Sequence, residues 1–229
     1  MYLFISIFLS HFIMMKRMLL IFLLLFVPMQ LVAKNKSYGS FIYIEELPHA
    51  LFLIGDIEKN DVFNLRKALR NHDIQTLVLA SPGGFVYEGL NMAGVIFDKG
   101  LRVYIPKEAI CASSCAFMFF AGKERKVDGE LGVHQFYFNE KVSSAGTQFT
   151  VSEIIGFLNE FETPRFVFER MFQQKEMYYF GKKELEEIET ASYTIEADQL
   201  KAIDDFWSNL LKELEDFEKN KPTWAQLQK

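Results

Sequence analysis

The chain has 229 residues, half of them hydrophobic, and a formal net charge of −5 at pH 7. This length and composition suit one domain with a sizeable buried core and an additional short segment. Its 25 basic residues are scattered and are outnumbered by 30 acidic ones. That balance excludes the basic surface of a nucleic-acid-binding protein, so we expect no nucleic-acid partner.

The N-terminal segment has the composition of an export signal. Lys16 and Arg17 precede an apolar run over residues 18–27, and Ala33 comes just before the next charged residues. This order of charged, apolar and cleavage regions is typical of a signal peptide. We expect residues 1–33 to be removed and the protein to be periplasmic or otherwise exported. Leu31 is a poor residue at its position before the cleavage point, so an uncleaved membrane anchor is the alternative.

From residue 40 the chain alternates β-rich runs with amphipathic helical segments, which predicts a layered α/β fold. We expect strands at 41–44, 51–57, 74–80, 101–105 and 132–138, and helices from 61, from 86 to Gly100, and at 114–121. A more charged, helical half follows, with helices at 153–161, 166–172, 182–189 and 205–219. We therefore predict one domain over 34–205, followed by a C-terminal amphipathic helix and tail over 206–229 that packs on the core or on a partner subunit.

Three motifs carry chemistry. Ser81-Pro82-Gly83-Gly84 ends an apolar run, Cys111-Ala112-Ser113-Ser114-Cys115-Ala116 opens an apolar helix, and Gly132-Val133-His134-Gln135 belongs to a strand. The glycine pair allows a sharp turn that aims a backbone N–H into a cavity. A serine at a helix start and a histidine complete the set that acyl transfer requires, namely a nucleophile, a base and donors for the oxyanion.

The order and spacing of these motifs, over roughly residues 41–190, resemble the Clp protease proteolytic subunit and its crotonase-fold relatives. The resemblance implies a crotonase-like α/β fold of ββα units with additional C-terminal helices. It also implies a serine peptidase that acts on peptide or protein substrates, self-associates and needs no metal or organic cofactor. By the same resemblance Ser113 is the nucleophile and His134 the base, while the amides of Gly84 and Ser114 form the oxyanion hole.

The group that orients the histidine is the open point of this resemblance. The family uses a downstream aspartate, but the comparable region here reads Glu176-Met177-Tyr178 and has no aspartate at the matching position. Glu176 is one residue out of register. It is the candidate third catalytic residue, and a backbone carbonyl or Tyr178 are the alternatives.

Cys111 and Cys115 are the only cysteines. Export to an oxidising compartment favours a disulfide. Two cysteines four residues apart on one helix are poorly placed for bridging, although we expect Cys111 to precede the helix, where it could bend inward. We therefore expect a buried thiol pair beside the serine and keep the disulfide as the alternative. No fourth ligand at a recognisable spacing completes a zinc site with these cysteines and a histidine.

Three other functions fit parts of the sequence. A serine–lysine peptidase could use Lys107, Lys123 or Lys141 as its base. An acyl-CoA hydratase or isomerase shares the fold and the oxyanion hole, but a serine–histidine pair and an export signal fit it poorly. A noncatalytic binding or assembly module could retain the fold without the chemistry.

Overall fold

The computed structural model describes residues 35–136, 144–173, 175–190 and 192–220. The chain divides into two units, Met1–Lys34 and Asn35–Lys229. The first unit contains the predicted signal peptide and lies outside the described residues. Within the described ranges, no helix combines the length and apolar character needed to cross a membrane.

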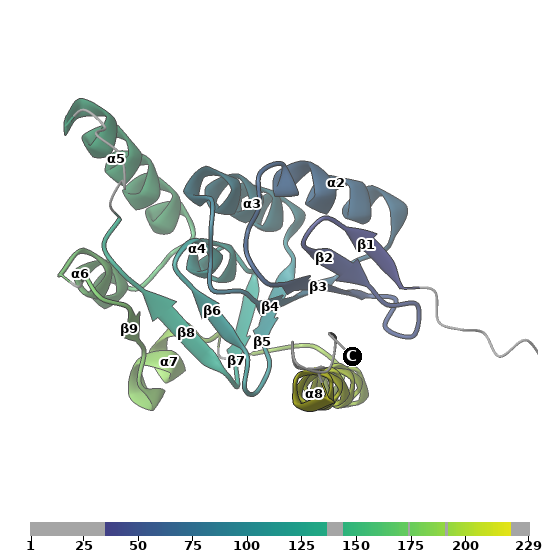
Figure 1. Cartoon of the computed structure of the whole chain (residues 1–229). Helices are drawn as coiled ribbons and strands as arrows, with labels where there is room; N and C mark the ends of the chain where they lie inside the picture. The colour runs from purple at the N-terminus through teal and green to yellow at the C-terminus, as the bar shows by residue number, and fades with distance from the viewer. Residues whose placement is uncertain (1–34, 137–143, 174, 191, 221–229) are drawn as a thin grey trace, which may run out of the picture. The chain divides into compact units, whose positions relative to one another are not determined.

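A six-stranded sheet forms the centre of the second unit (Figure 1). Its strands, in spatial order, are β1 (Lys36–Tyr38), β2 (Phe41–Tyr43), β3 (Ala50–Ile54), β4 (Thr76–Ala80), β5 (Arg102–Ile105) and β7 (Glu124–Val127). The first three pair antiparallel, and β3, β4, β5 and β7 are parallel. Parallel strands require crossover connections, and the helices between them supply these.

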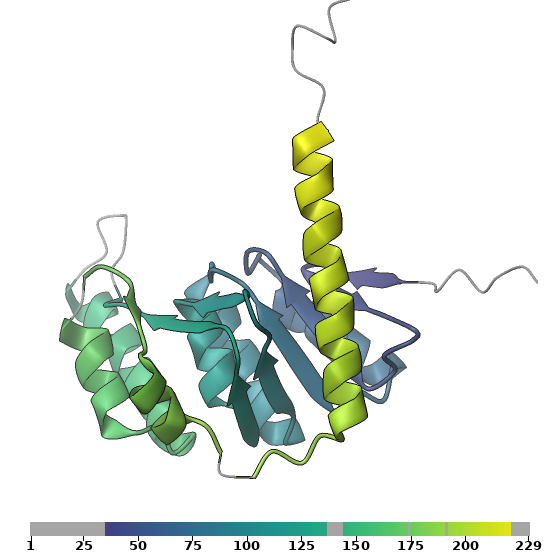
Figure 2. The same ribbon diagram turned by 90° about the horizontal axis from the view of Figure 1, so that it is seen from below.

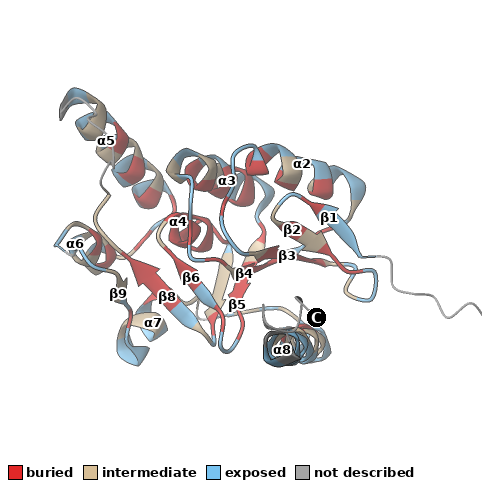
Figure 3. Ribbon diagram, in the orientation of Figure 1, coloured by how far each residue is buried: buried red, intermediate tan, exposed pale blue. Residues whose placement is uncertain are grey.

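Both faces of this sheet are buried, as expected for a largely parallel sheet. Successive side chains of a strand point to opposite faces. On β4, Leu77 and Leu79 therefore join the main hydrophobic core, whereas Val78 joins a smaller cluster on the other face. Figure 3 shows these buried segments in red between exposed outer surfaces. Burial of both faces explains why the central strands are predominantly apolar and do not alternate between apolar and polar residues.

Three helices cover the face that carries the main core: α2 (Asp61–Asn71), α3 (Val86–Lys99) and α4 (Ser114–Phe120). Helix α4 is buried at every position, as its uniformly apolar sequence predicts. Helix α3 ends at Gly100, whose φ of 59° lies in the left-handed region that glycine tolerates best. The predicted end of this helix is therefore confirmed.

A second, three-stranded sheet leads into the serine and histidine motifs, whereas the glycine motif follows β4 of the large sheet. It consists of β6 (Ile110–Ala112), β8 (Glu130–Val133) and β9 (Tyr178–Tyr179), in that order. Strands β6 and β8 are parallel, and β9 runs antiparallel to β8. The short β6 and the polar β7 were not expected, because neither shows the alternation or the apolar run that marks a strand.

The remaining helices are α5 (Ser144–Glu160), α6 (Arg165–Gln173), α7 (Lys182–Ile188) and α8 (Ala197–Asn220). Pro164 separates α5 from α6, as expected from its effect on the preceding residue. Helix α8 begins at Ala197 rather than at residue 205, so the predicted boundary between 205 and 206 falls inside one helix.

Helix α8 packs against the second face of the large sheet through its first half. Ile203 is buried in the smaller cluster, Trp207 Nε1 donates to the Lys107 carbonyl at 2.9 Å, and Tyr104 Oη lies 2.6 Å from Asp204 Oδ1. Figure 2 shows the second half continuing beyond the sheet. Leu214 and Phe217 on this half are exposed.

Candidate active site

Ser113 lies in a tight turn between β6 and α4. Its φ of 56° and ψ of −124° are unusual for a residue with a side chain. The Ser113 N–H donates to the Gly132 carbonyl at 3.1 Å, and the Ser113 carbonyl accepts from the Ala116 N–H at 3.0 Å. The turn is therefore fixed from both sides, and the hydroxyl is presented at the start of the helix.

His134 reaches this hydroxyl from the neighbouring strand. Its Nε2 lies 2.8 Å from Ser113 Oγ, and its Nδ1 lies 2.9 Å from the Gln135 carbonyl oxygen. The histidine follows the end of β8 instead of opening a strand over 132–138, because β9 is only two residues long and its pairing with β8 stops at Val133. Residues 134–136 belong to no strand, and the imidazole reaches the serine hydroxyl.

Gly83, the first glycine of the pair after β4, packs directly on the serine turn. Gly83 has a φ of 104°, and a methyl group there would lie 2.8 Å from Ser113 Cβ and 3.1 Å from Ser114 N. The Gly83 N–H donates to Ser81 Oγ at 3.1 Å, which closes the loop on itself. Only a residue without a side chain can occupy this position.

Gly84 is held by a different neighbour. A bridge joins it to Ile57, with the Ile57 N–H donating to the Gly83 carbonyl and the Phe85 N–H donating to the Ile57 carbonyl. These bonds use the residues on either side of Gly84. Among the hydrogen bonds of the described residues, none involves the N–H of Gly84 or of Ser114, and an oxyanion hole needs two such donors.

Ser114 is the first residue of α4, where backbone N–H groups lack intrahelical acceptors. Its position is set by the close crossing of α3 and α4 at Gly89. A methyl group at Gly89 would lie 2.7 Å from the Ser114 carbonyl oxygen and 2.9 Å from its Cβ. The crossing fixes the first turn of α4 and with it the direction of the Ser114 amide.

A cavity of about 300 Å³ opens over the serine. It is lined by Gly84, Val86, Ser113, Phe117, Val133, His134, Phe136 and Met171. Five of these side chains are apolar, so the cavity offers an apolar surface beside one hydroxyl and one imidazole. Met171 comes from α6, far along the chain, and Phe136 follows the histidine. Sequence reasoning singled out neither, because an isolated apolar residue gives no signal of a site.

Glu176, the candidate orienting carboxylate, is exposed in the bend before β9. No hydrogen bond or ion pair of the described residues joins it to His134. Strand register supplies the reason, since Val133 pairs with Tyr178. If the pairing continued, Met177 would lie opposite His134, and Glu176 would lie one residue further on, toward the other face. The observed partner of Nδ1 is a backbone carbonyl, one of the alternatives considered from the sequence.

Tyr178, the other alternative, makes different contacts. Its hydroxyl lies 2.8 Å from Glu184 Oε2, and the Arg170 guanidinium lies over its ring at 4.7 Å from the centroid. Burial raises the pKa of Glu184, but hydrogen bonds from the Gly181 N–H, the Tyr178 hydroxyl and Arg170 outweigh burial and hold that pKa below its usual value. This cluster joins β9 to α6 and α7.

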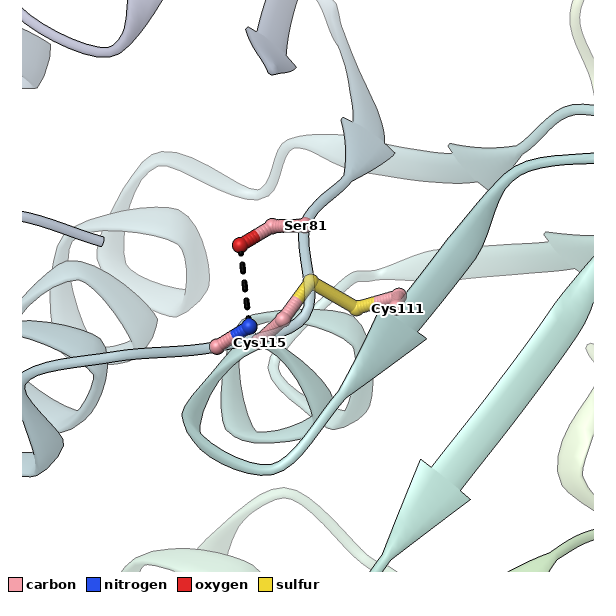
Figure 4. The surroundings of a disulfide bond; sticks show 4 residues. Ser81, Cys111 and Cys115 are labelled. Atoms are coloured by element: carbon pink, nitrogen blue, oxygen red, sulfur yellow. Dashed lines mark hydrogen bonds between the residues drawn. A yellow bond between two sulfur atoms is a disulfide. The ribbon is translucent and has the colours of Figure 1, made fainter. Parts of the chain in front are cut away.

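Cys111 and Cys115 form a disulfide, with their Cα atoms 5.3 Å apart (Figure 4). The expectation of a thiol pair was wrong because it gave too much weight to the poor geometry of two cysteines four residues apart on one helix. Cys111 lies on β6 and only Cys115 lies on α4. The turn at Ser113 brings the two Cα atoms into the range that a disulfide spans.

Two of the three candidate lysine bases, Lys107 and Lys123, are not at this site. Lys107 and Lys123 do not line the cavity, and Lys107 is exposed beside Glu108, with 3.9 Å between Nζ and Oε1. Lys141 lies outside the described residues. Among the residues that are described, no group of three or more histidine, cysteine, aspartate or glutamate side chains could hold a metal ion.

Comparison with solved structures finds bacterial proteins whose folds are similar to this one. A variant of ClpP1 from Listeria monocytogenes superposes with a TM-score of 0.53 and 15% sequence identity, covering 67% of this chain and 95% of that one. ClpP1 from the same organism gives a TM-score of 0.51 and 14% identity, covering 62% of this chain and 88% of that one. No protein-family model matches the sequence, and no curated protein matches it.

The chain therefore has a mixed α/β fold of the ClpP type. This finding confirms the resemblance to the Clp protease proteolytic subunit and the fold class expected from the sequence. At such low identity it concerns the fold alone, and the roles of individual side chains must be argued from the geometry of this site.

Proposed function

We propose that this protein is an exported serine peptidase-like hydrolase that cleaves peptide bonds through an acyl-enzyme at Ser113. The observation that carries the proposal is the 2.8 Å contact between Ser113 Oγ and His134 Nε2 at the floor of an apolar cavity. A nucleophile and a base within hydrogen-bond reach, with the base held by a third group, define this class of mechanism.

The Gln135 carbonyl determines which nitrogen of His134 acts as the base. A carbonyl oxygen can only accept a hydrogen bond, so Nδ1 carries the proton in the contact of 2.9 Å. In the neutral ring Nε2 is then an acceptor, and the Ser113 hydroxyl donates to it. The imidazole is thus held in the tautomer that general-base catalysis needs, through a neutral backbone group.

The reaction follows from this arrangement. Ser113 Oγ attacks the carbonyl carbon of the substrate while its proton passes to His134 Nε2. The negative charge on the carbonyl oxygen is stabilised by the N–H groups of Gly84 and Ser114, and each such donor is typically worth about 10²- to 10³-fold in turnover. His134 returns the proton to the amine as the carbon–nitrogen bond breaks. Water, activated by the same imidazole, then hydrolyses the acyl-enzyme and restores the serine.

The cellular setting belongs to the same proposal. Export is supported by the composition of residues 1–33 and by the disulfide, since such bonds persist mainly in oxidising compartments. An uncleaved membrane anchor remains the alternative to cleavage after Ala33. Peptide substrates and self-association follow from the family resemblance, and the apolar cavity is compatible with an apolar substrate side chain.

Covalent labelling tests the function. The purified protein and its Ser113→Ala variant are incubated with a fluorophosphonate probe, and the adduct is measured by intact mass. We expect one adduct on the wild type and none on the variant, with circular dichroism showing that both are folded. Absence of labelling on a folded wild type would reject an activated serine and favour a noncatalytic binding module. A thioester substrate that is turned over in preference to peptides would favour the hydratase-like alternative.

A further inference from the structure

The disulfide encloses the catalytic turn itself. Cys111 and Cys115 are four residues apart, so the bond closes a ring around Ala112, Ser113 and Ser114. The proposed function, on which this inference rests, places both the nucleophile and one oxyanion donor inside this ring. Both cysteines are completely buried.

Strand β6, which carries Cys111, connects the other two parts of the site. A bridge joins Cys111 to Ser81, with the Ser81 N–H donating to the Ile110 carbonyl at 2.7 Å and the Ala112 N–H donating to the Ser81 carbonyl at 3.0 Å. Ser81 begins the glycine loop and lies next to the disulfide in Figure 4. On its other side, Cys111 pairs with Leu131 of β8, the strand that leads to His134.

The turn before helix α4 is tied to β8 by the Ser113 N–H, which donates to the Gly132 carbonyl at 3.1 Å. Within the part of the chain that the structure describes, no hydrogen bond joins the main chain of Ser114 or Cys115 to these strands. The position of the helix depends on side-chain packing and on the close approach to α3 at Gly89. The residue between strand and helix, Ser113, has a positive φ that a serine adopts only when its surroundings impose it. Holding this turn therefore calls for a link between the start of the helix and strand β6, in addition to the Ser113–Gly132 hydrogen bond and the crossing at Gly89.

We infer that the Cys111–Cys115 disulfide is that link and that the two cysteines are positioning residues of the catalytic serine. The bond links the first turn of α4 to the strand that already holds the glycine loop and the histidine strand. It limits the positions that Ser113 Oγ can adopt relative to His134 Nε2. It also limits the positions that the Ser114 N–H can adopt relative to the Gly84 N–H. A misplacement of about 1 Å between reacting groups can cost about 10²-fold in rate.

The test replaces both cysteines and measures reactivity and local motion separately. The variant Cys111→Ala/Cys115→Ala removes the bond, and Cys111→Ala/Cys115→Val removes it while restoring part of the lost packing volume. Leu65→Ala, in the buried face of α2, is the control, because it destabilises the same core without touching the turn. Each protein is studied well below its melting temperature.

Two quantities are measured on each protein. The first is fluorophosphonate labelling, resolved into the maximal labelling rate and the probe concentration at half-maximal rate. The second is amide hydrogen exchange over residues 110–120. In both disulfide variants we expect the maximal rate to fall by about 10- to 100-fold with the half-saturating concentration little changed, and exchange to be faster in the turn. Leu65→Ala should keep the wild-type rate and exchange in this segment.

The outcomes separate the two proposals. Unchanged labelling and unchanged exchange in the disulfide variants would overturn the positioning role. A rate loss as large in Leu65→Ala would also overturn it, because general loss of stability would then explain the effect. If the wild type is not labelled but the variants exchange faster in the turn, the hydrolase function fails while the role of the disulfide in holding this turn is supported.

Discussion

Replacement of Gly84 by alanine tests whether the glycine loop is catalytic or only a turn. Gly84 has a φ of 147°, which side chains rarely tolerate, and an added Cβ would lie 2.3 Å from the Ile57 carbonyl oxygen and 2.8 Å from its nitrogen. Both of these atoms belong to backbone that is hydrogen-bonded to the loop on either side of Gly84. The clash therefore cannot be relieved by rotating a side chain, and the loop itself must move.

The expected cost has two parts. A residue with a side chain in such a backbone region costs about 1 to 3 kcal/mol, and forcing a methyl group into a packed site costs a further 1 to 3 kcal/mol or so. The free energy of unfolding should therefore fall by about 2 to 6 kcal/mol, which a domain of this size can survive. Displacing the Gly84 N–H should lower the rate of acyl-enzyme formation by about 10²- to 10³-fold.

Gly55→Ala is the matched control. Gly55 also has a positive φ, of 87°, but no atom lies within 4 Å of the position of an added Cβ. This variant should lose about 1 to 3 kcal/mol of stability through backbone strain and keep its reactivity. The assay is fluorophosphonate labelling rate together with urea denaturation. If a folded Gly84→Ala protein labels at the wild-type rate, the Gly84 amide has no part in the oxyanion hole.

Three further predictions concern the base and the supporting clusters. His134→Asn should lower the labelling rate by about 10²- to 10⁴-fold without changing the melting temperature, and an unchanged rate would remove His134 as the base. Because the pKa of Glu184 is held below its usual value in the folded state, its contribution to stability is present above the unfolded-state pKa and is lost as the pH falls through the folded-state value. Glu184→Gln should thus lower stability by at most about 1 kcal/mol near neutral pH, and by progressively less as the pH falls below the unfolded-state pKa. A pH-independent difference in urea denaturation would contradict this. Trp207→Ala removes a buried indole that donates to the Lys107 carbonyl and should cost about 3 to 5 kcal/mol, with earlier trypsin cleavage in α8 as the sign that this helix has detached.

The sequence predicted the layered fold because the central strands and the helices between them carry strong apolar patterns. Strand β4 is a continuous apolar run, and α3 shows helical spacing that stops at Gly100. Strands β6 and β7 were missed for the opposite reason. Ile110–Ala112 has only three residues, and Glu124–Val127 is largely polar because it lies at the edge of the sheet. Such strands are defined by their neighbours more than by their own residues.

The parts of the site that the sequence could not supply are those that depend on register and backbone direction. A motif identifies His134, but the group that holds its ring follows from where β8 stops pairing with β9, and that point depends on contacts between segments more than 40 residues apart. Backbone carbonyls also carry no residue signature, so the role of the Gln135 carbonyl is invisible in the sequence. Likewise, the disulfide depends on a change from strand to helix between residues 112 and 114, which spacing alone does not determine.

The Gln135 carbonyl and the disulfide both bear on how Ser113 and His134 are held before the reaction begins. The Gln135 carbonyl fixes the tautomer of His134 and leaves Nε2 to accept the Ser113 proton. The rate then depends on how well Ser113 is placed against Nε2. A covalent ring around the serine, buried between the strand and the helix, supplies that placement. On this reasoning, removing the disulfide should be more damaging here than a similar loss of stability elsewhere in the core.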